Sequence, residues 1–486
     1  MSIDPRVAAI HDWQVANGSL LKRITGENAE AYPVNVALKP SHFPRACFVH
    51  AQELQTIFNR LYAAVSSDEA WLEKALSNLL QTDTLARRLW DIHKEAKRDG
   101  LVQPISMGVF RSDYMVQDAA TPNDRQIIKQ VEFNTFSVAG GVHANKISDM
   151  HRLFERIGSP PSTDLMPLND TKDSIVAAFE RAHRLYAREN GGDRRLAVMM
   201  VVQPNNFNVC DECPIVYGLW YRGIPCYRVE WGDQLETSVS YGSSSKELLL
   251  RLLDGESMEI SIVYYRAGYE EKEYDQFGCE IRCIIEQSRA IKCPSILGHL
   301  STMKVIQQKL SERQHLEHFL NPEDAEKVLA VCCEMFPMDT SEMGMKARSL
   351  ALDRSTAPAY VLKPSLEGGG NNVYGNDIPG YLGFEDEESW SNYILMAKIQ
   401  PPKDVTNTLL SCKEGVYEGG IVSELGIFGA CVWKTLPQDQ DERAGPPVQI
   451  LEDETIGFSL KSKRWDVDEM SVVKGYGCFD SPKLVP

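Results

Sequence analysis

The sequence predicts an α/β protein of two or three lobes, and three observations lead to this prediction. A chain of 486 residues with 43% hydrophobic content can bury a sizeable core. Between residues 196 and 300, buried strands alternate with helical segments, which is typical of a parallel sheet. After residue 300 the strands are shorter and are separated by proline and glycine, so we expect a differently organised part there.

Apolar residues at helical spacing predict two scaffold helices in the N-terminal part of the chain, residues 1–195. The first covers 82–100 and ends at a glycine, and the second covers about 173–189 and ends before Gly-Gly. The inward stripe of the first helix contains Leu85, Leu89, Ile92 and Ala96. The inward stripe of the second contains Ile175, Phe179, Ala182 and Tyr186.

Residues 196–300 are predicted to form an inserted parallel-sheet domain. The run Leu-Ala-Val-Met-Met-Val-Val from Leu196 is continuously apolar, as expected of a strand buried on both faces. Further strands are expected at 226–231 and 260–265. Helical segments are expected near 215–221 and from about 271 to 290.

The last part of the chain, 301–486, is predicted to contain short strands at 360–362, 393–399 and 420–433. The stretch 435–454 is rich in Asp, Glu, Gln and Pro. We therefore expect a mobile surface loop there rather than a packed element.

Composition excludes several classes of protein. The 51 basic and 68 acidic residues give a net charge of −17, which opposes binding to nucleic acid or to anionic lipid. No apolar run reaches the roughly 18 residues of a membrane span, and the N-terminus lacks a secretory signal, so we expect a cytoplasmic protein. Most of the twelve cysteines are expected to be free thiols. Cys210 and Cys213 have metal spacing but no matching second pair.

The stretch 361–375 is the most informative part of the sequence. A predicted strand carries Lys363 into three glycines, 368–370, with Glu367 before them and Asn371 and Asn372 after them. Glycine backbone N–H groups can approach a polyphosphate, the lysine adds a fixed positive charge, and the glutamate can hold magnesium. The alternative is a mobile surface loop, but the flanking residues favour phosphate binding. Neither a Walker loop nor a dinucleotide fingerprint is present, and an ATP-grasp plan fits better.

At this point the sequence closely resembles the eukaryotic glutathione synthetases. The family's glycine-rich loop, Lys-Pro-x-x-Glu-Gly-Gly-Gly-Asn-Asn-x-Tyr-Gly, occurs here at 363–375. Four other family motifs appear in the family's order: Arg-Ser-Asp-Tyr-Met at 111–115, Glu-Phe-Asn-Thr at 132–135, Arg-Ala-Gly-Tyr at 266–269 and Ser-Glu-Leu-Gly-Ile-Phe-Gly at 423–429. The resemblance implies an ATP-grasp-type fold with mixed and antiparallel sheets, a glycine-rich lid at about 355–435, and a substrate-binding role for the inserted parallel-sheet domain.

The resemblance also implies a reaction. ATP would phosphorylate the C-terminal carboxylate of a γ-glutamylcysteine-like peptide, and the amine of glycine would displace the phosphate. Catalytic roles are implied for Arg111, Lys363, Gly368 and Gly369, and Mg²⁺ is implied at Glu132, Asn134 and Glu367. ATP contacts are implied for Asn134, Lys304, Lys363, Gly368, Gly369, Gly370, Asn371, Asn372, Tyr374, Met396, Lys398, Ile399, Glu424 and Lys463. Substrate contacts are implied for Arg111, Ser137, Asn208, Glu212, Arg266, Tyr269, Lys461, Val472 and Val473.

Departures from the family pattern cluster on the substrate side. Ala139 stands where the family has a second serine, and Glu212 and Cys213 replace a glutamine and an arginine. Lys461 replaces an arginine, which keeps the charge but loses the bidentate fork. Val473 lies in a bulkier version of the loop that covers glycine. These residues predict intact ATP chemistry with altered substrate recognition.

Three functions therefore stay open at this stage. The first is a ligase that makes glutathione from small-molecule substrates. The second is a paralogous ligase with another carboxylate donor or another amine. The third is a catalytically silent nucleotide-binding or interaction protein that has kept the fold. In each case the family suggests a homodimer, and we expect neither a nucleic acid nor a membrane partner.

Overall fold

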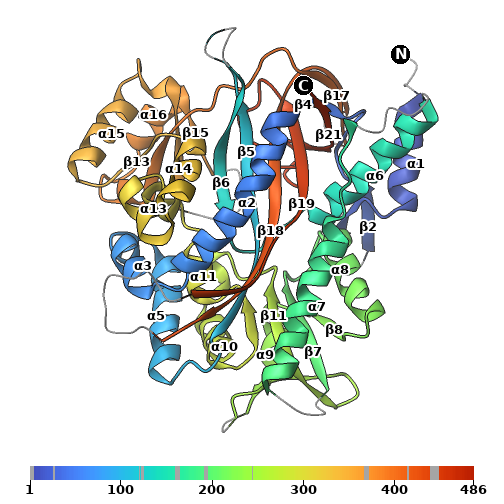
Figure 1. Ribbon diagram of the computed structural model, residues 1–486, viewed down its shortest axis with the longest axis vertical. Helices are drawn as coiled ribbons and strands as arrows, with labels where there is room; N and C mark the ends of the chain where they lie inside the picture. Colours follow the sequence, from blue (N-terminus) through green and yellow to red (C-terminus); the bar gives the residue numbers. More distant parts are fainter. Residues whose placement is uncertain are drawn as a thin grey trace.

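The computed structural model describes residues 5–25, 28–119, 121, 125–158, 165–190, 195–242, 245–365, 371–412, 415–437 and 448–486. Within these residues a sheet of thirteen strands runs through the molecule, with helices on both faces and a small separate sheet at one side (Figure 1). Among the described helices, none combines the length and the apolar character that crossing a membrane would require.

The upper half of the large sheet is antiparallel and consists mainly of four long strands. They are β5 (Ile105–Gln117), β6 (Ile127–Asn134), β18 (Gly415–Thr435) and β19 (Val448–Arg464). β5 lies between β6 and β18, and β19 follows β18. Short strands complete this edge: β17 (Thr406–Ser411), β3 (Val36–Ala37) and β20 (Cys478–Asp480).

Side-chain alternation along these strands separates two faces. Phe110 and Ile427 belong to the apolar core that includes residues of α2 (Arg45–Val65). Their neighbours Val109 and Phe428 belong to the apolar core that includes residues of α7 (Thr171–Asn190). Because successive side chains of a strand point to opposite faces, α2 and α7 pack on opposite sides of the sheet.

The prediction of a loop at 435–454 was wrong for its last part. Residues 438–447 lie outside the described residues, but 448–454 form the start of β19 and pair with β18 from Ala430 to Thr435. The acidic side chains that suggested a loop have partners in the fold. Asp453 accepts hydrogen bonds from Asn59 at 2.9 Å and from Arg60 at 3.2 Å, and a Glu452 oxygen lies 3.2 Å from Nε of Arg181. Composition alone does not show such long-range partners.

The lower half of the large sheet is the predicted parallel unit. β7 (Leu196–Val202), β8 (Cys226–Glu230), β11 (Ser257–Tyr265) and β12 (Ile291–Cys293) run parallel to one another, which confirms that prediction. Two strands at its edge are antiparallel, β9 (Val239–Tyr241) and β10 (Leu248–Arg251). The unit joins the upper half through β12 and β5, where Lys292 faces Ser106. The proposed domain boundaries at 195 and 300 stay a prediction.

The predicted scaffold helices are present. Residues 82–100 contain α5 (Thr84–Arg98), which begins after Asp83, whose carboxylate accepts a hydrogen bond from Ala86 N at 2.7 Å. The helices of the parallel unit are α8 (Val209–Tyr221), α9 (Asp233–Ser238) and α10 (Gln276–Gln287). The other helices of the body are α1 (Pro5–Ala16), α3 (Glu69–Ala75), α4 (Leu79–Thr82), α6 (Gly141–Gly158), α11 (Ile296–Leu300), α12 (Lys304–Lys309), α13 (Arg313–Phe319) and α14 (Pro322–Val331).

A separate four-stranded antiparallel sheet lies beside the upper half of the large sheet (Figure 1). Its order is β13 (Met335–Pro337), β16 (Tyr393–Ala397), β14 (Tyr360–Pro364) and β15 (Val373–Tyr374). It has its own apolar core with α15 (Glu342–Leu352) and α16 (Ile378–Leu382). Two strand pairs complete the fold: β1 (Leu20–Thr25) with β2 (Asn28–Pro33), and β4 (Ser41–Pro44) with β21 (Pro482–Val485).

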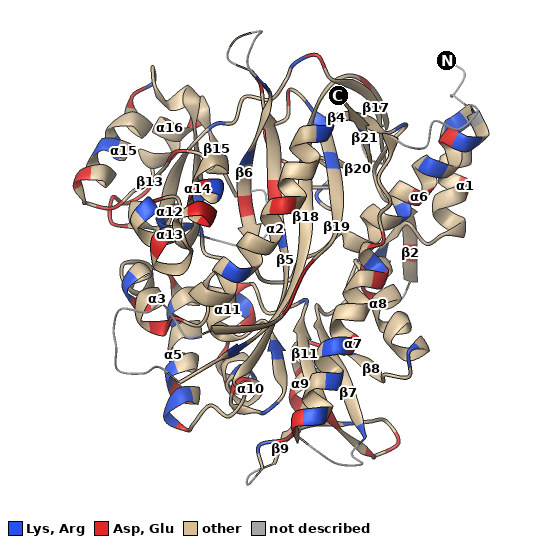
Figure 2. Cartoon of the chain, in the orientation of Figure 1, with Lys and Arg blue, Asp and Glu red and all other residues tan. Residues whose placement is uncertain are grey.

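Charged residues are interspersed along the outer helices and also occur on strands of the central sheet (Figure 2). Charges inside a sheet are costly unless they are paired or bind a ligand. The central charges are therefore the starting point for locating a functional site.

Candidate active site

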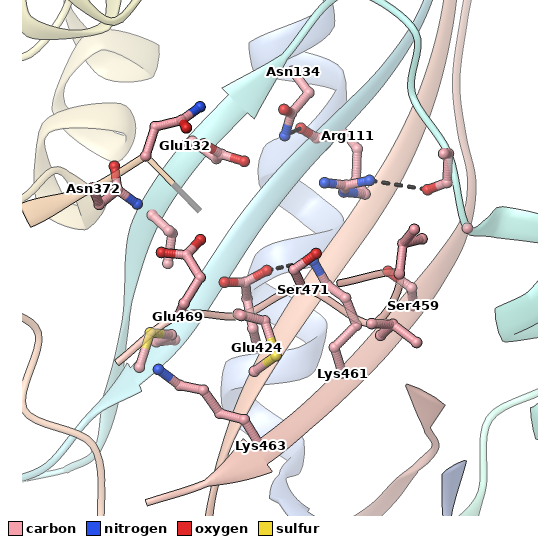
Figure 3. A pocket seen from close by; sticks show the side chains of 18 of the residues that line it. Arg111, Glu132, Asn134, Asn372, Glu424, Ser459, Lys461, Lys463, Glu469 and Ser471 are labelled. Carbon is pink, nitrogen blue, oxygen red and sulfur yellow. Dashed lines mark hydrogen bonds and ion pairs between the residues drawn. The ribbon is translucent and has the colours of Figure 1, made fainter. Parts of the chain in front are cut away.

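A cavity of about 640 Å³ lies between the large sheet and the small antiparallel sheet (Figure 3). Its volume is in the range of small-molecule and cofactor sites. Every sequence-predicted site residue that the structure describes lines it: Arg111, Glu132, Asn134, Ser137, Asn208, Glu212, Arg266, Tyr269, Lys304, Lys363, Asn371, Asn372, Tyr374, Met396, Lys398, Ile399, Glu424, Lys461, Lys463, Val472 and Val473. The predicted residues Glu367, Gly368, Gly369 and Gly370 lie outside the described residues.

Strand alternation explains why so many polar residues share one cavity. On β6, Phe133 packs into the core on the α2 side, so its neighbours Glu132 and Asn134 point to the opposite face. Arg111 on β5 and Glu424 on β18 lie on that same face. Residues far apart in the sequence thus meet above one surface of the antiparallel half.

Arg111 is held in a fixed position in this surface. Its Nε and Nη2 donate to the two carboxylate oxygens of Asp113 at 2.6 and 2.7 Å, and its Nη1 donates to the Ala139 carbonyl at 2.9 Å. Asn134 donates Nδ2 to the same Asp113 carboxylate at 3.2 Å. The sequence analysis did not single out Asp113, although its position two residues after Arg111 on one strand would have placed both on one face.

Two lysines and a glutamate form the most charged part of the cavity. Nζ of Lys304, the first residue of α12, lies 2.9 Å from Oε2 of Glu132. Lys363 on β14 donates to the Val131 carbonyl at 2.7 Å. Burial alone would raise the pKa of Glu132, but the charges of Lys304 and Lys363 outweigh it and lower that pKa. Burial lowers the pKa of Lys363, against the opposing effect of Glu132. The cluster can accept further negative charge beside its lysines.

Glu424 and Lys461 face each other across β18 and β19, and their charged atoms lie 2.5 Å apart. Burial raises the pKa of Glu424, and the charge of Lys461 opposes that rise. The next cavity-facing lysine, Lys463, donates to the backbone oxygen of Asp468. Lys461 keeps a positive charge in the place where the family pattern has an arginine, but it is already engaged by an acid.

Acidic residues of the segment after β19 hold the small sheet. Lys398 donates to Asp468 at 2.8 Å, and Tyr374 donates its hydroxyl to Glu469 at 3.0 Å. Met396 on β16 and Ile399 just beyond it are buried and give this side an apolar wall. Asp468 and Glu469 also line the cavity and were not predicted from the sequence. The available signal was their position a few residues after Lys463, a predicted ATP contact.

The other end of the cavity is built by the parallel unit. Arg266 is almost fully buried, and its Nη2 donates to Asp211 at 3.0 Å. Asp211 also accepts from the backbone N–H groups of Gly140 and Val142 at 2.9 and 3.0 Å, next to the start of α6. Ser137 adopts a positive φ of 50° at this end, a conformation that non-glycine residues keep mainly at functional sites. The arginine and the loop that carries Ser137 are therefore held by one aspartate.

Glu212 is also buried here and has two partners. Arg228 donates to its Oε2 at 2.9 Å, and Asn206 donates to both of its oxygens at 2.8 and 2.7 Å. His143 lines the cavity nearby, and burial lowers its pKa to about 4, so it is neutral at physiological pH. The cavity residues that were not predicted from the sequence include Leu21, Phe136, Gln203, Asn206, Phe207, Ser459 and Ser471.

The donor set suits a magnesium ion that is held partly by phosphate oxygens. Glu132 and Asn134 offer a carboxylate and an amide oxygen, and Lys304 and Lys363 stand close by. Among the described residues, no group of three or more His, Cys, Asp or Glu could hold a metal alone. Mg²⁺ is commonly bound through one or two carboxylates together with substrate phosphates. The residues therefore fit this ion.

All twelve cysteines are free thiols, as the sequence predicted for most of them.

Comparison with known proteins agrees with this description. A small antiparallel sheet beside a large mixed sheet, with a lysine-lined cavity between them, is an ATP-grasp-type architecture. Residues 2–484 match the family described as "Eukaryotic glutathione synthase, ATP binding domain", and the chain belongs to this family.

Curated relatives are similar along almost their whole length. The large chain of glutathione synthetase from Schizosaccharomyces pombe is 31% identical, with 97% of this chain and 96% of that protein covered. Glutathione synthetase from Homo sapiens is 32% identical, with 97% and 94% covered. A glutathione synthetase-like effector from Globodera pallida, solved in its apo form, shares the fold with a TM-score of 0.74 at 20% identity, over 100% of this chain and 98% of that one. The protein is an ATP-dependent ligase.

Proposed function

We propose that this ligase joins a γ-glutamylcysteine-like peptide to glycine and so forms glutathione, with ATP and Mg²⁺. The observation that carries the proposal is the single cavity shared by the lysine–glutamate cluster, the half-buried Arg111 and the buried Arg266. One end offers lysines for phosphates, with Arg111 on β5 beside them, and the other end offers Arg266 for a carboxylate-bearing peptide. The proposed domain division assigns the second end to the inserted parallel unit.

The residues divide the chemical work as follows. Lys304 and Lys363 offset the negative charge of the phosphates when the peptide carboxylate attacks the γ-phosphorus and ADP leaves. Glu132 and Asn134 would hold the magnesium, which neutralises charge on the phosphates. Arg111 orients the carboxylate that becomes the acyl phosphate. The amine of glycine then forms the amide bond, releases inorganic phosphate and loses its proton.

A second candidate is a ligase with the same ATP chemistry but another donor or another amine. It is favoured by the buried Glu212, which Arg228 and Asn206 already hold, and by Lys461, which Glu424 engages. Ala139 and Val473 also line the cavity, whereas Cys213 is not among its lining residues. These positions predict changed recognition of either substrate.

The test is ADP release by the purified protein with ATP, Mg²⁺, γ-glutamylcysteine and glycine. Turnover that needs both substrates supports glutathione formation. Turnover only with another pair from a panel of carboxylates and amines supports the second candidate. If no pair causes ADP release while Mg·ADP still binds, the protein is a silent nucleotide-binding protein. Sedimentation and cell fractionation would test the proposed homodimer and the proposed cytoplasmic location.

A further inference from the structure

We propose that Asp113 is a positioning residue that sets the orientation of Arg111 and Asn134 together. This inference rests on the proposed function, because it concerns the groups that would meet the peptide carboxylate and the magnesium. Asp113 itself does not line the cavity, and its side chain is completely buried beneath it.

The Arg111 guanidinium is clamped on two sides. Asp113 takes Nε and Nη2 in a bidentate pair, and the Ala139 carbonyl takes Nη1. Such a pair fixes the plane of the guanidinium as well as its position. The remaining N–H groups of Arg111 are then already oriented when they bind a substrate oxygen, so the side chain loses little conformational entropy.

The same carboxylate fixes the orientation of the side-chain amide of Asn134. Its Nδ2 donates to Oδ2 of Asp113 at 3.2 Å and to the backbone oxygen of Arg111 at 3.3 Å. With the amide nitrogen engaged by these two acceptors, the carbonyl oxygen is the atom that a cation can use. An asparagine at position 113 would offer one acceptor oxygen in place of two, so Arg111 and Asn134 would compete for it and this orientation would be weakened.

The strand beside Asp113 leaves room for this arrangement. Gly426 on β18 faces Asp113 in the sheet register. A Cβ added at Gly426 would lie 2.7 Å from Oδ1 of Asp113, 2.9 Å from Cδ of Arg111 and 2.6 Å from Oγ of Ser459. An alanine at position 426 would therefore displace the paired side chains of Asp113 and Arg111 without changing the charge of either.

The experiment compares Asp113→Asn with Glu259→Gln. Glu259 is a matched control because it is a buried carboxylate on the same sheet, paired with Arg289 at 2.7 Å and away from the cavity. We expect Asp113→Asn to raise the KM of the carboxylate donor, to lower kcat and to weaken Mg·ADP binding in calorimetry, each by ~10–100-fold, the usual range for residues that orient ligands. The KM of the amine should change much less, whereas the unfolding temperature should fall in both variants, because each removes one charge of a buried pair. Glu259→Gln should affect the unfolding temperature only.

A second pair of variants covers the case in which Asp113→Asn does not fold. Gly426→Ala should reproduce the weaker Mg·ADP binding, whereas Gly380→Ala should not, because a Cβ there meets no atom within 4 Å. Wild-type donor KM and wild-type Mg·ADP binding in Asp113→Asn or, if that variant does not fold, in Gly426→Ala would overturn the inference. Absence of turnover in the wild-type protein would instead count against the proposed function, and calorimetry would still decide the role of Asp113.

Discussion

The buried pair of Asp211 and Arg266 allows a quantitative prediction. Substitution Asp211→Asn keeps one of the two oxygens that accept from Gly140 and Val142, and it removes the charge that faces Arg266 at 3.0 Å. Removing one partner of a buried ion pair costs ~3–5 kcal/mol, because the other charge remains buried without compensation. Glu212, whose nearest oxygen lies 3.9 Å from Arg266, offsets part of this cost. We therefore expect a loss near the lower limit, about 3 kcal/mol of the free energy of unfolding.

Urea unfolding of four proteins measures this effect: the wild type, Asp211→Asn, Arg266→Gln and the double variant. The double variant should be more stable than the sum of the single losses predicts, because no lone charge is left inside. Asp83→Asn serves as a control, since Asp83 accepts a hydrogen bond from Ala86 N at the start of α5. It should cost less than about 1 kcal/mol. Strict additivity of the two single losses would refute the reasoning.

Three further predictions concern pH and the cavity. The His93 ring, whose Nε2 lies 3.5 Å from Oε2 of Glu69, is the main reason that the pKa of Glu69 is lowered to about 2. The contribution of Glu69 to stability is therefore present above the unfolded pKa of about 4.3 and is lost as pH falls toward 2, so the loss of unfolding temperature in Glu69→Gln should shrink over that range in calorimetric scans. Asp468→Asn should release Lys398 for the nucleotide and lower the KM of ATP by about 2–5-fold, as expected for removal of a part-exposed competitor worth ~0.3–1 kcal/mol; an unchanged KM in steady-state assays would argue against this competition. Lys461→Arg should lower the KM of an amine substrate that carries a carboxylate, because an arginine can bind both carboxylate oxygens. The KM of an amine without a carboxylate should stay unchanged.

Much of the fold could be predicted because local patterns determine it. The apolar run from Leu196 became a central strand of the parallel unit, and the stripe of 82–100 became the buried face of α5. Pairing between distant segments could not be predicted in this way. β5 and β18 lie about three hundred residues apart in the chain, and no local pattern records their register. The strand at 448–454 was missed for the same reason, since its acids meet partners on α2 and α7.

The candidate site could be predicted as a set of residues but not as a set of contacts. The family resemblance predicted Arg111, Glu132 and Lys304 as site residues, and the structure brings all three to one cavity. The sequence did not show which acid holds which base, so Asp113 and Asp468 were not identified. Both act through side-chain pairs formed only when strands or loops come together.

The junction at β12 and β5 has a consequence for how the two substrates meet. Glu132 and Asn134 stand on the antiparallel half, whereas Arg266 belongs to the parallel half, and the ladder between the halves consists of Lys292 opposite Ser106. In the proposed reaction, a change of twist at that seam would shift the donor around Arg266 relative to the phosphates. The helix α7 packs on β11 as well as on β18 and β19 and so resists such a change, which makes its packing a determinant of how closely the two reactants approach.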